Sequence, residues 1–259
     1  MAPIRKGDGT PLEIPGVSEV RSGDGRVFFE GDAIPDSGVF QIDATTLNLS
    51  DGDGVTDWKD QIGSNDLSGG TPTYQTSELI DPTVTGDATD DELINTSPSG
   101  LPTGDSERTI ILVMQSQSAA SGETIFAYGN DASGERIAVI NDDRNTSGGD
   151  LFIEVQGGSV TANSVFSADE KHLITIRMPS GASANDITLR DNGTDLSLDE
   201  INDVALNTTL SYVSAFALNG ANYSGDSLSE AIIYDSELAG SALTDEEQRL
   251  ADKWGITLA

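Results

Sequence analysis

Residues 227–256, SLSEAIIYDSELAGSALTDEEQRLADKWGI, decide the fold that we predict. Between residues 228 and 234, apolar side chains occur on both faces of an extended segment, which is typical of a strand buried between two layers. A predicted helix follows, with Thr244 as its N-cap and Glu247 completing a capping box. One face of this helix is apolar and needs a sheet to cover; it consists of Leu243, Leu250, Ala251 and Trp254.

Short apolar runs recur upstream of this stretch, and polar turns rich in Gly, Asn and Asp separate them. Asp191-Asn192-Gly193 is the strongest hairpin turn among them. Many short strands with a single confident helix predict an all-β fold, a two-sheet sandwich or jelly roll with a short C-terminal helix. The predicted strands are residues 107–114, 124–128, 136–140, 151–155, 172–177, 187–190 and 210–218.

A second stretch, residues 49–74 (LSDGDGVTDWKDQIGSNDLSGGTPTY), carries a recognisable motif. Together with the closing strand and helix, it resembles concanavalin A-like (laminin G-like) lectin/glucanase domains. The chain departs from that pattern at Ile62 and Asp66, where the family has Ser and Asn. The resemblance covers residues 39–259 and implies a concanavalin A-like jelly-roll sandwich. The matching positions are Trp58, Asp60, Gly63, Asn65, Pro72 and Tyr74.

Residues 1–37 differ from the sandwich that we assign to residues 38–259. Two strand candidates, 17–21 and 26–30, flank a glycine-rich turn and predict a hairpin. A lone hairpin is marginally stable in water, so its apolar side chains need another surface. Val27, Phe28 and Phe29 therefore pack either on the main domain or on another subunit, and we expect an arm for assembly or anchoring in a homo-oligomer.

The charge of the chain is extreme, with 44 Asp and Glu against 13 Lys and Arg and a net charge of −31. Such a surface repels itself in dilute buffer, whereas molar salt shortens the screening length to about 3 Å. We therefore expect a protein from a high-salt environment. No basic stripe is present to meet phosphates, which argues against nucleic-acid binding.

The chain contains no cysteine, so neither disulfides nor thiolate chemistry are expected. Its N-terminal residues lack an apolar core of signal-peptide length, and no run is long enough to insert into a membrane. A display-type domain without an export signal is expected where a particle is assembled inside the host cell.

The enzyme hypothesis lacks its usual motif, because hydrolases of the related glucanase fold place paired carboxylates on one strand. Glu154 and Glu230 have no acidic neighbour two residues away. The sole histidine, His172, begins a predicted strand and is expected at the surface. We therefore predict no catalytic residues and no enzymatic activity.

A calcium site is predicted at Asp51, Asp53 and Asp57, three carboxylates in one glycine-bent loop. The spacing differs from that of an EF-hand, and Asp-Gly pairs are also ordinary turn residues, so a simple turn remains the alternative.

Glycan binding would need an aromatic ring beside polar groups, and Tyr223 is the most plausible exposed ring. Asn-x-Ser/Thr acceptor sequences occur mainly in predicted turns, where glycosylation is possible. They are centred on Asn48, Asn95, Asn145, Asn192, Asn207 and Asn222.

These observations favour a non-enzymatic surface protein of the virion of a tailed virus of halophilic archaea: a turret, spike, decoration or tail-associated protein. Its lectin-like domain would contact the host surface or a glycan, and its partners would be copies of itself and other virion proteins. The alternative is a cellular, calcium-assisted carbohydrate-binding module of a halophile.

Overall fold

The computed structural model describes residues 18–21, 27–30, 37–116, 122–143 and 149–259. The chain divides into two compact units, Met1–Asp36 and Ser37–Ala259. In the first unit, β1 (Ser18–Arg21) pairs antiparallel with β2 (Val27–Glu30), so the predicted hairpin strands are present. Val27, Phe28 and Phe29 lie in β2, and their side chains are outside the described part of the structure.

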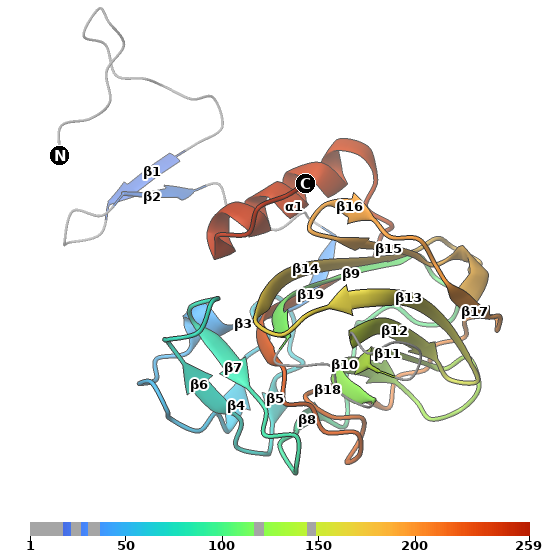
Figure 1. Ribbon diagram of the computed structural model, residues 1–259, viewed down its shortest axis with the longest axis horizontal. Helices are drawn as coiled ribbons and strands as arrows, with labels where there is room; N and C mark the ends of the chain where they lie inside the picture. The colour runs from blue at the N-terminus through green and yellow to red at the C-terminus, as the bar shows by residue number, and fades with distance from the viewer. Residues whose placement is uncertain (1–17, 22–26, 31–36, 117–121, 144–148) are drawn as a thin grey trace, which may run out of the picture. The chain divides into compact units, whose positions relative to one another are not determined.

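The second unit is a sandwich of two antiparallel sheets (Figure 1), which confirms the predicted fold class. The first sheet has nine strands. In spatial order they are β17 (Glu200–Asn202), β13 (Gly158–Phe166), β12 (Gly149–Val155), β11 (Arg136–Asp142), β10 (Glu123–Gly129), β18 (Tyr212–Ala215), β8 (Leu93–Asn95), β5 (Leu67–Ser68) and β4 (Asp57–Trp58).

The second sheet has eight strands. The main order is β16 (Thr194–Asp195), β15 (Thr188–Asp191), β14 (Glu170–Met178), β9 (Arg108–Ser116), β19 (Ser227–Tyr234), β7 (Thr83–Thr85) and β6 (Thr73–Gln75), and β3 (Gly38–Asp43) also pairs with β19. Two short 3-10 helices, η1 (Ala44–Thr46) and η2 (Ala184–Asp186), and the helix α1 (Gly240–Trp254) complete the described elements.

The core lies between the two sheets. Phe40 of β3 and Phe126 of β10 meet there, with ring centroids 5.8 Å apart. Trp58 and Trp254 are both buried, and burial of Trp254 agrees with its place on the predicted apolar face of the helix. Arg108 is also fully buried, and its guanidinium donates to the Tyr128 hydroxyl at 2.8 Å and to the backbone oxygen of Gly104 at 2.9 Å. A buried cation is tolerated when its donors are satisfied in this way.

The closing strand and helix are where the sequence placed them, but the predicted start of the helix is wrong. The helix α1 begins at Gly240, four residues before Thr244, and its N-cap residue Ala239 makes no side-chain cap hydrogen bond. Gly240 has φ 57°, a left-handed conformation that glycine adopts without strain, and this turn starts the helix. Glu247 is buried instead of capping, and its Oε1 accepts hydrogen bonds from Thr175 at 3.0 Å and from Arg190 at 2.9 Å.

Glu230 of β19 anchors the helix to the eight-stranded sheet. Its Oε2 accepts hydrogen bonds from Lys253 Nζ at 2.7 Å and Trp254 Nε1 at 2.6 Å, and its Oε1 accepts one from Gln41 of β3 at 2.6 Å. Lys253 also pairs with Asp43 at 2.6 Å. Burial raises the pKa of the Glu230 carboxyl, and the nearby Lys253 cation opposes this rise.

The motif that carried the family resemblance forms a tight loop around one carboxylate. Asp60 Oδ1 accepts from the backbone N–H groups of Gln41 and Gly63, each at 3.0 Å, and its Oδ2 accepts from Asn65 N–H at 3.0 Å. A Cβ at Gly63 would lie 2.6 Å from Asp60 Oδ2, so this position has no room for a side chain. The motif is therefore a structural device that ties the loop to β3.

His172 is buried rather than exposed, contrary to the sequence-based expectation. Its Nδ1 lies 3.1 Å from an oxygen of Asp191, and its ring meets Phe166 edge-on at 5.0 Å. The reason is β13, a strand that the sequence did not reveal, which places Phe166 beside the histidine.

The helix α1 is 15 residues long and only one of its faces is apolar. No helix in the described part of the chain has the length and apolarity needed to cross a membrane.

The Glu230 anchor leads to a stability prediction. Lys253→Met should lower the free energy of unfolding by about 3 kcal/mol, because it leaves two buried carboxylates without the cation they share. Urea denaturation at high salt measures this loss. The control is Lys59→Met, in an exposed pair with Asp66 at 2.8 Å, which should change stability by less than about 1 kcal/mol. Equal losses in the two variants would contradict the anchoring role.

Candidate functional site

The outer face of the nine-stranded sheet presents a regular set of side chains. Alternate residues of a strand point to opposite faces, and Val139 of β11 is on the core side, because it is opposite Phe126. Ala138, Ile140 and Asp142 therefore face outward. The register places each of them opposite a residue of β12, in the pairs Ala138–Glu154, Ile140–Phe152 and Asp142–Asp150.

The same face continues across β13 to the edge strand β17. Phe152 is opposite Thr161, Glu154 is opposite Ser159, and Ser159 is opposite Asn202. A groove with a volume of about 730 Å³ lies over these strands, and we call it the outer-face groove. Its size is within the range of small-ligand sites. It is lined by Asp142, Asp150, Phe152, Glu154, Gly157, Gly158, Ser159, Thr161, Ile201 and Asn202.

The groove combines one aromatic ring with polar side chains. Phe152 is half-buried, and Asn202 is exposed on the edge strand. Thr161 is 1% exposed, and its hydroxyl has no hydrogen-bond partner among the described residues. Asp142 and Asp150 are buried, and Asp150 Oδ1 accepts from Ser164 N–H at 2.8 Å. Asp142, Asp150 and Phe152 also have further contacts beyond these.

An ion-pair network borders the groove. Arg136 Nη2 lies 2.8 Å from Glu154 Oε2 and 2.6 Å from Gln156 Oε1, and its Nη1 pairs with Asp131. Burial acts to raise the pKa of Asp131, but hydrogen bonds from Arg136 and from neighbouring side chains outweigh it and hold this pKa below its usual value. Burial raises the pKa of Tyr212, whose hydroxyl lies 3.2 Å from Asp131.

An apolar cluster adjoins the groove on the same face. Its buried members are Ala127, Ala138, Ile140 and Tyr212, and the partly buried Ile94, Phe152 and Leu218 pack against it. Phe152 belongs to both the cluster and the groove. It therefore lies at the border between an apolar and a polar surface.

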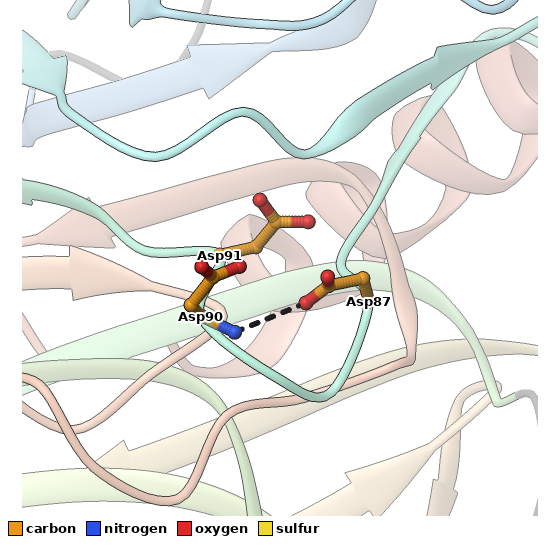
Figure 2. Close-up of side chains that lie close together, drawn as sticks. All are labelled: Asp87, Asp90 and Asp91. Atoms are coloured by element: carbon orange, nitrogen blue, oxygen red, sulfur yellow. Dashed lines mark hydrogen bonds between the residues drawn. The ribbon is translucent and has the colours of Figure 1, made fainter.

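A second group of carboxylates lies in the loop between β7 and β8. Figure 2 shows Asp87, Asp90 and Asp91, whose nearest ligand atoms all lie within 4.8 Å of one another. Asp90 N–H donates to Asp87 Oδ1 at 3.1 Å. Burial raises the pKa of Asp91, and the neighbouring Asp87 and Asp90 charges add to the rise. This cluster could hold a metal ion.

The structure does not bring the predicted calcium ligands into a comparable cluster. Among the described residues, the carboxylates close enough to share a metal ion are Asp87, Asp90 and Asp91, which we call the Asp87 cluster. Asp51, Asp53 and Asp57 do not belong to it. Asp53 Oδ2 accepts from Ser50 N–H at 2.8 Å, which is a local turn bond, and Asp51 Oδ1 accepts from Thr76 N–H at 2.7 Å, which ties the loop to the residue after β6. Asp57 is exposed in β4.

Tyr223 is half-buried and lies in a loop next to the Asp87 cluster. The two loops are joined by a hydrogen bond from Ala88 N–H to the backbone oxygen of Ser224 at 3.3 Å. Tyr223 lies outside the outer-face groove. Of the glycosylation candidates, Asn48, Asn207 and Asn222 are exposed. Asn95 and Asn192 donate to backbone oxygens, and Asn145 lies outside the described residues.

The sequence matches no family model and no curated protein. Solved structures do match. An arabinofuranosidase complexed with arabinofuranosyl-alpha-1,2-xylobiose is 14% identical, with a TM-score of 0.56, over 78% of this chain and 51% of that one. This chain therefore spans about half the length of that enzyme.

Two further structures match at similar levels. Domain 4 of AbnA, a GH43 extracellular arabinanase from Geobacillus stearothermophilus in complex with arabinotriose, is 14% identical, with a TM-score of 0.54, over 82% of this chain and 100% of that one. The binding domain of Botulinum neurotoxin DC in complex with SialylT is 13% identical, with a TM-score of 0.53, over 84% of this chain and 52% of that one. What they share with this chain is a two-sheet β-sandwich fold.

This likeness corrects the prediction that the chain is not an enzyme. The same sandwich occurs in a structure of an arabinofuranosidase. The absence of two acidic residues on one strand excludes only one arrangement of catalytic carboxylates. The prediction of a non-enzymatic protein, which was drawn from that absence, was therefore wrong. Glu154 lines the outer-face groove, whereas Glu230 is buried beneath α1.

Proposed function

We propose that this chain binds glycans and that the glycan occupies the outer-face groove. The observation that carries the proposal is the position of Phe152, half-buried at the border between an apolar cluster and a polar groove. A sugar ring has one face of C–H groups and a rim of hydroxyls, so it needs an apolar platform with hydrogen-bonding groups beside it.

The groove supplies both kinds of contact. Phe152 offers the ring, and the half-buried carboxylate of Glu154 accepts hydrogen bonds from hydroxyls. Thr161 and Asn202 can both donate and accept. Two solved structures support the proposal: Domain 4 of AbnA, which this chain matches over its whole length, is in complex with arabinotriose, and the neurotoxin binding domain is in complex with SialylT. We also propose that the chain belongs to the concanavalin A-like family, which its sequence resembles.

Replacing Phe152 tests this proposal. Phe152→Ala should weaken glycan binding by about tenfold or more, because the platform is lost. Asn202→Ala, at an exposed edge position, should weaken it without disturbing the apolar cluster. Binding is measured on a glycan array and then by calorimetry, with circular dichroism as the check on folding.

Tyr223→Ala is the matched control, since it removes the aromatic ring that the sequence favoured. Binding should survive this change. Loss of binding in Tyr223→Ala, with Phe152→Ala unaffected, would move the site to the loop at residues 219–225. A wild-type chain that binds no glycan would end the proposal.

Calcium is the ion that we propose for the Asp87 cluster. Hard cations prefer carboxylate oxygens, and all three side chains offer them. The ion would be structural or would lie near Tyr223, since the cluster and that loop are joined by the Ala88–Ser224 hydrogen bond.

Calorimetric titration with CaCl₂ checks this proposal. Asp90→Asn should abolish calcium binding, whereas Asp53→Asn, in the loop predicted from the sequence, should leave it intact. The opposite pattern would restore the site at Asp51, Asp53 and Asp57. No heat in the wild type would remove calcium altogether.

The biological setting of the proposal rests on the sequence alone. A net charge of −31 supports function at high salt. The apolar β2 residues support an assembly role for residues 1–37, with the sandwich displayed on the surface of a virion of a halophilic archaeal virus. The rival setting is a monomeric carbohydrate-binding module of a halophilic cell.

Light scattering in molar KCl separates these two settings. The full chain should form a defined oligomer there, and the variant lacking residues 1–37 should be monomeric. The triple change Val27→Ser, Phe28→Ser and Phe29→Ser should act like the deletion, while Val20→Ser on β1 is the control. A monomeric full chain would favour the cellular module.

A further inference from the structure

We infer that Lys253 and Asp43 react with each other to form an isopeptide bond, a covalent amide between the two side chains, and that Glu230 carries the proton this reaction requires. The bond joins the helix α1 to the end of β3. The inference is independent of glycan binding. It is carried by the distances, the burial and the hydrogen bonds of these three side chains.

The reacting groups are already in contact. Lys253 Nζ lies 2.6 Å from Asp43 Oδ2 and 2.7 Å from Glu230 Oε2. The carboxyl carbon of Asp43 is one covalent bond beyond Oδ2, so a small rotation of the Lys253 side chain brings the amine against it. Holding two reactants in this way replaces a bimolecular encounter with an intramolecular one, which strongly accelerates bond formation.

The two oxygens of Asp43 have different surroundings. Its Oδ1 accepts hydrogen bonds from the backbone N–H of Thr45 at 2.8 Å and from the Thr45 hydroxyl at 2.7 Å, whereas its Oδ2 faces the amine. Negative charge develops on a carboxyl oxygen when an amine attacks the carbon, and donors already aimed at that oxygen stabilise the transition state. Oδ1 is therefore the oxygen that the amide retains, and Oδ2 is the oxygen that leaves.

Glu230 is placed to move the proton. Its side chain is 1% exposed, and Gln41 Nε2 and Trp254 Nε1 each donate to it at 2.6 Å, which fixes its position. Burial raises the pKa of Glu230, and the Asp43 charge adds to the rise, although the Lys253 cation opposes it. A carboxylate with a raised pKa can take a proton from the Lys253 ammonium, and only the neutral amine has the lone pair that attacks.

The reaction balances without a further reagent. Lys253 passes one proton of its ammonium to Glu230, and Nζ then attacks the Asp43 carboxyl carbon to form the C–N bond. The C–Oδ2 bond breaks, and the oxygen leaves as water with the proton held by Glu230 and a second proton from Nζ. An ammonium and a carboxylate thus become a neutral amide and one water, and Glu230 returns to its starting state.

The site is sheltered from solvent, which favours loss of water over hydrolysis. The side chains of Lys253 and Asp43 are 19% and 9% exposed, and the buried Trp254 ring lies 4.9 Å from Nζ. Lys59 and Asp66 provide the contrast, since they lie 2.8 Å apart but their side chains are 62% and 43% exposed. Contact of an amine with a carboxylate is therefore not sufficient, and the Lys253 site adds burial and a second carboxyl.

The bond would tie together distant parts of the sequence. The chain contains no cysteine, so this amide is a covalent tie of another kind than a disulfide. Asp43 and Lys253 are 210 residues apart, and the amide keeps β3 joined to α1 even in the unfolded chain. Closing so long a loop removes conformational entropy from the unfolded state and thereby stabilises the folded one.

Mass spectrometry of the denatured full chain tests the inference. The wild type should be lighter than its sequence by the mass of one water molecule. Trypsin should not cut after Lys253, and the digest should contain a branched peptide in which residues 27–59 are joined to residues 250–259. The pair of Lys59 and Asp66 is the internal control, and trypsin should cut normally after Lys59.

Three variants assign the roles. Lys253→Arg keeps a cation whose guanidinium stays protonated, and Asp43→Ala removes the carboxyl, so both should retain the full mass. Glu230→Gln keeps the shape of the side chain and removes its proton transfer. It should slow bond formation by about a hundredfold or more, measured by mass in samples taken after cell-free synthesis. Circular dichroism checks that each variant is folded.

Other results would contradict the inference. A wild-type chain of full mass that trypsin cuts after Lys253 would overturn it. A branch to residues 191–249, which contain Glu230, would reverse the roles of the two carboxyls and overturn it as stated. A branched peptide at Lys59, or a Glu230→Gln variant that forms the bond as fast as the wild type, would overturn the role given to the geometry of this site. The glycan-binding proposal is unaffected by any of these results.

Discussion

The buried carboxylate of Glu230 is the interaction on which the rest of the sandwich depends. It joins β19 to β3, 189 residues away in the sequence, through Gln41, and to α1 through Lys253 and Trp254. Removing a carboxylate from water is costly, and the donors that surround it offset that cost. The geometry of these donors therefore fixes where α1 lies, and with it the cover over the eight-stranded sheet.

Because α1 covers the eight-stranded sheet, the two outer faces of the sandwich differ in character. Glu246 and Glu247 of the helix are buried against that sheet, where they accept hydrogen bonds from Tyr234 and Thr175. The outer face of the nine-stranded sheet instead carries the groove and its half-buried Phe152. A single domain thus separates a face that a helix covers from a face that carries a groove.

The fold class was predictable because the apolar pattern of β19 and the chemistry of the turns are local signals. The strand β13, GSVTANSVF, was missed because its polar residues hide the alternation, and burial of His172 was missed with it. The groove could not be predicted, since only the cross-strand register brings Asp142 opposite Asp150 and Phe152 opposite Thr161. The helix start was wrong because a turn at Gly240, not a side-chain cap, begins it.

The pairing of β3 with β19 also determines when the molecule can fold. Gln41 and Glu230 are 189 residues apart in the sequence. During synthesis, β3 is therefore the first strand of the sandwich to leave the ribosome, and it cannot pair until β19, the last strand, has been made. Until then β3 and β9 each lack the neighbour that lies between them in the finished sheet. Such long-range closure is slow and leaves strand edges open to other chains. At low ionic strength the dense negative charge of the chain would keep those edges apart, whereas molar salt would screen this repulsion.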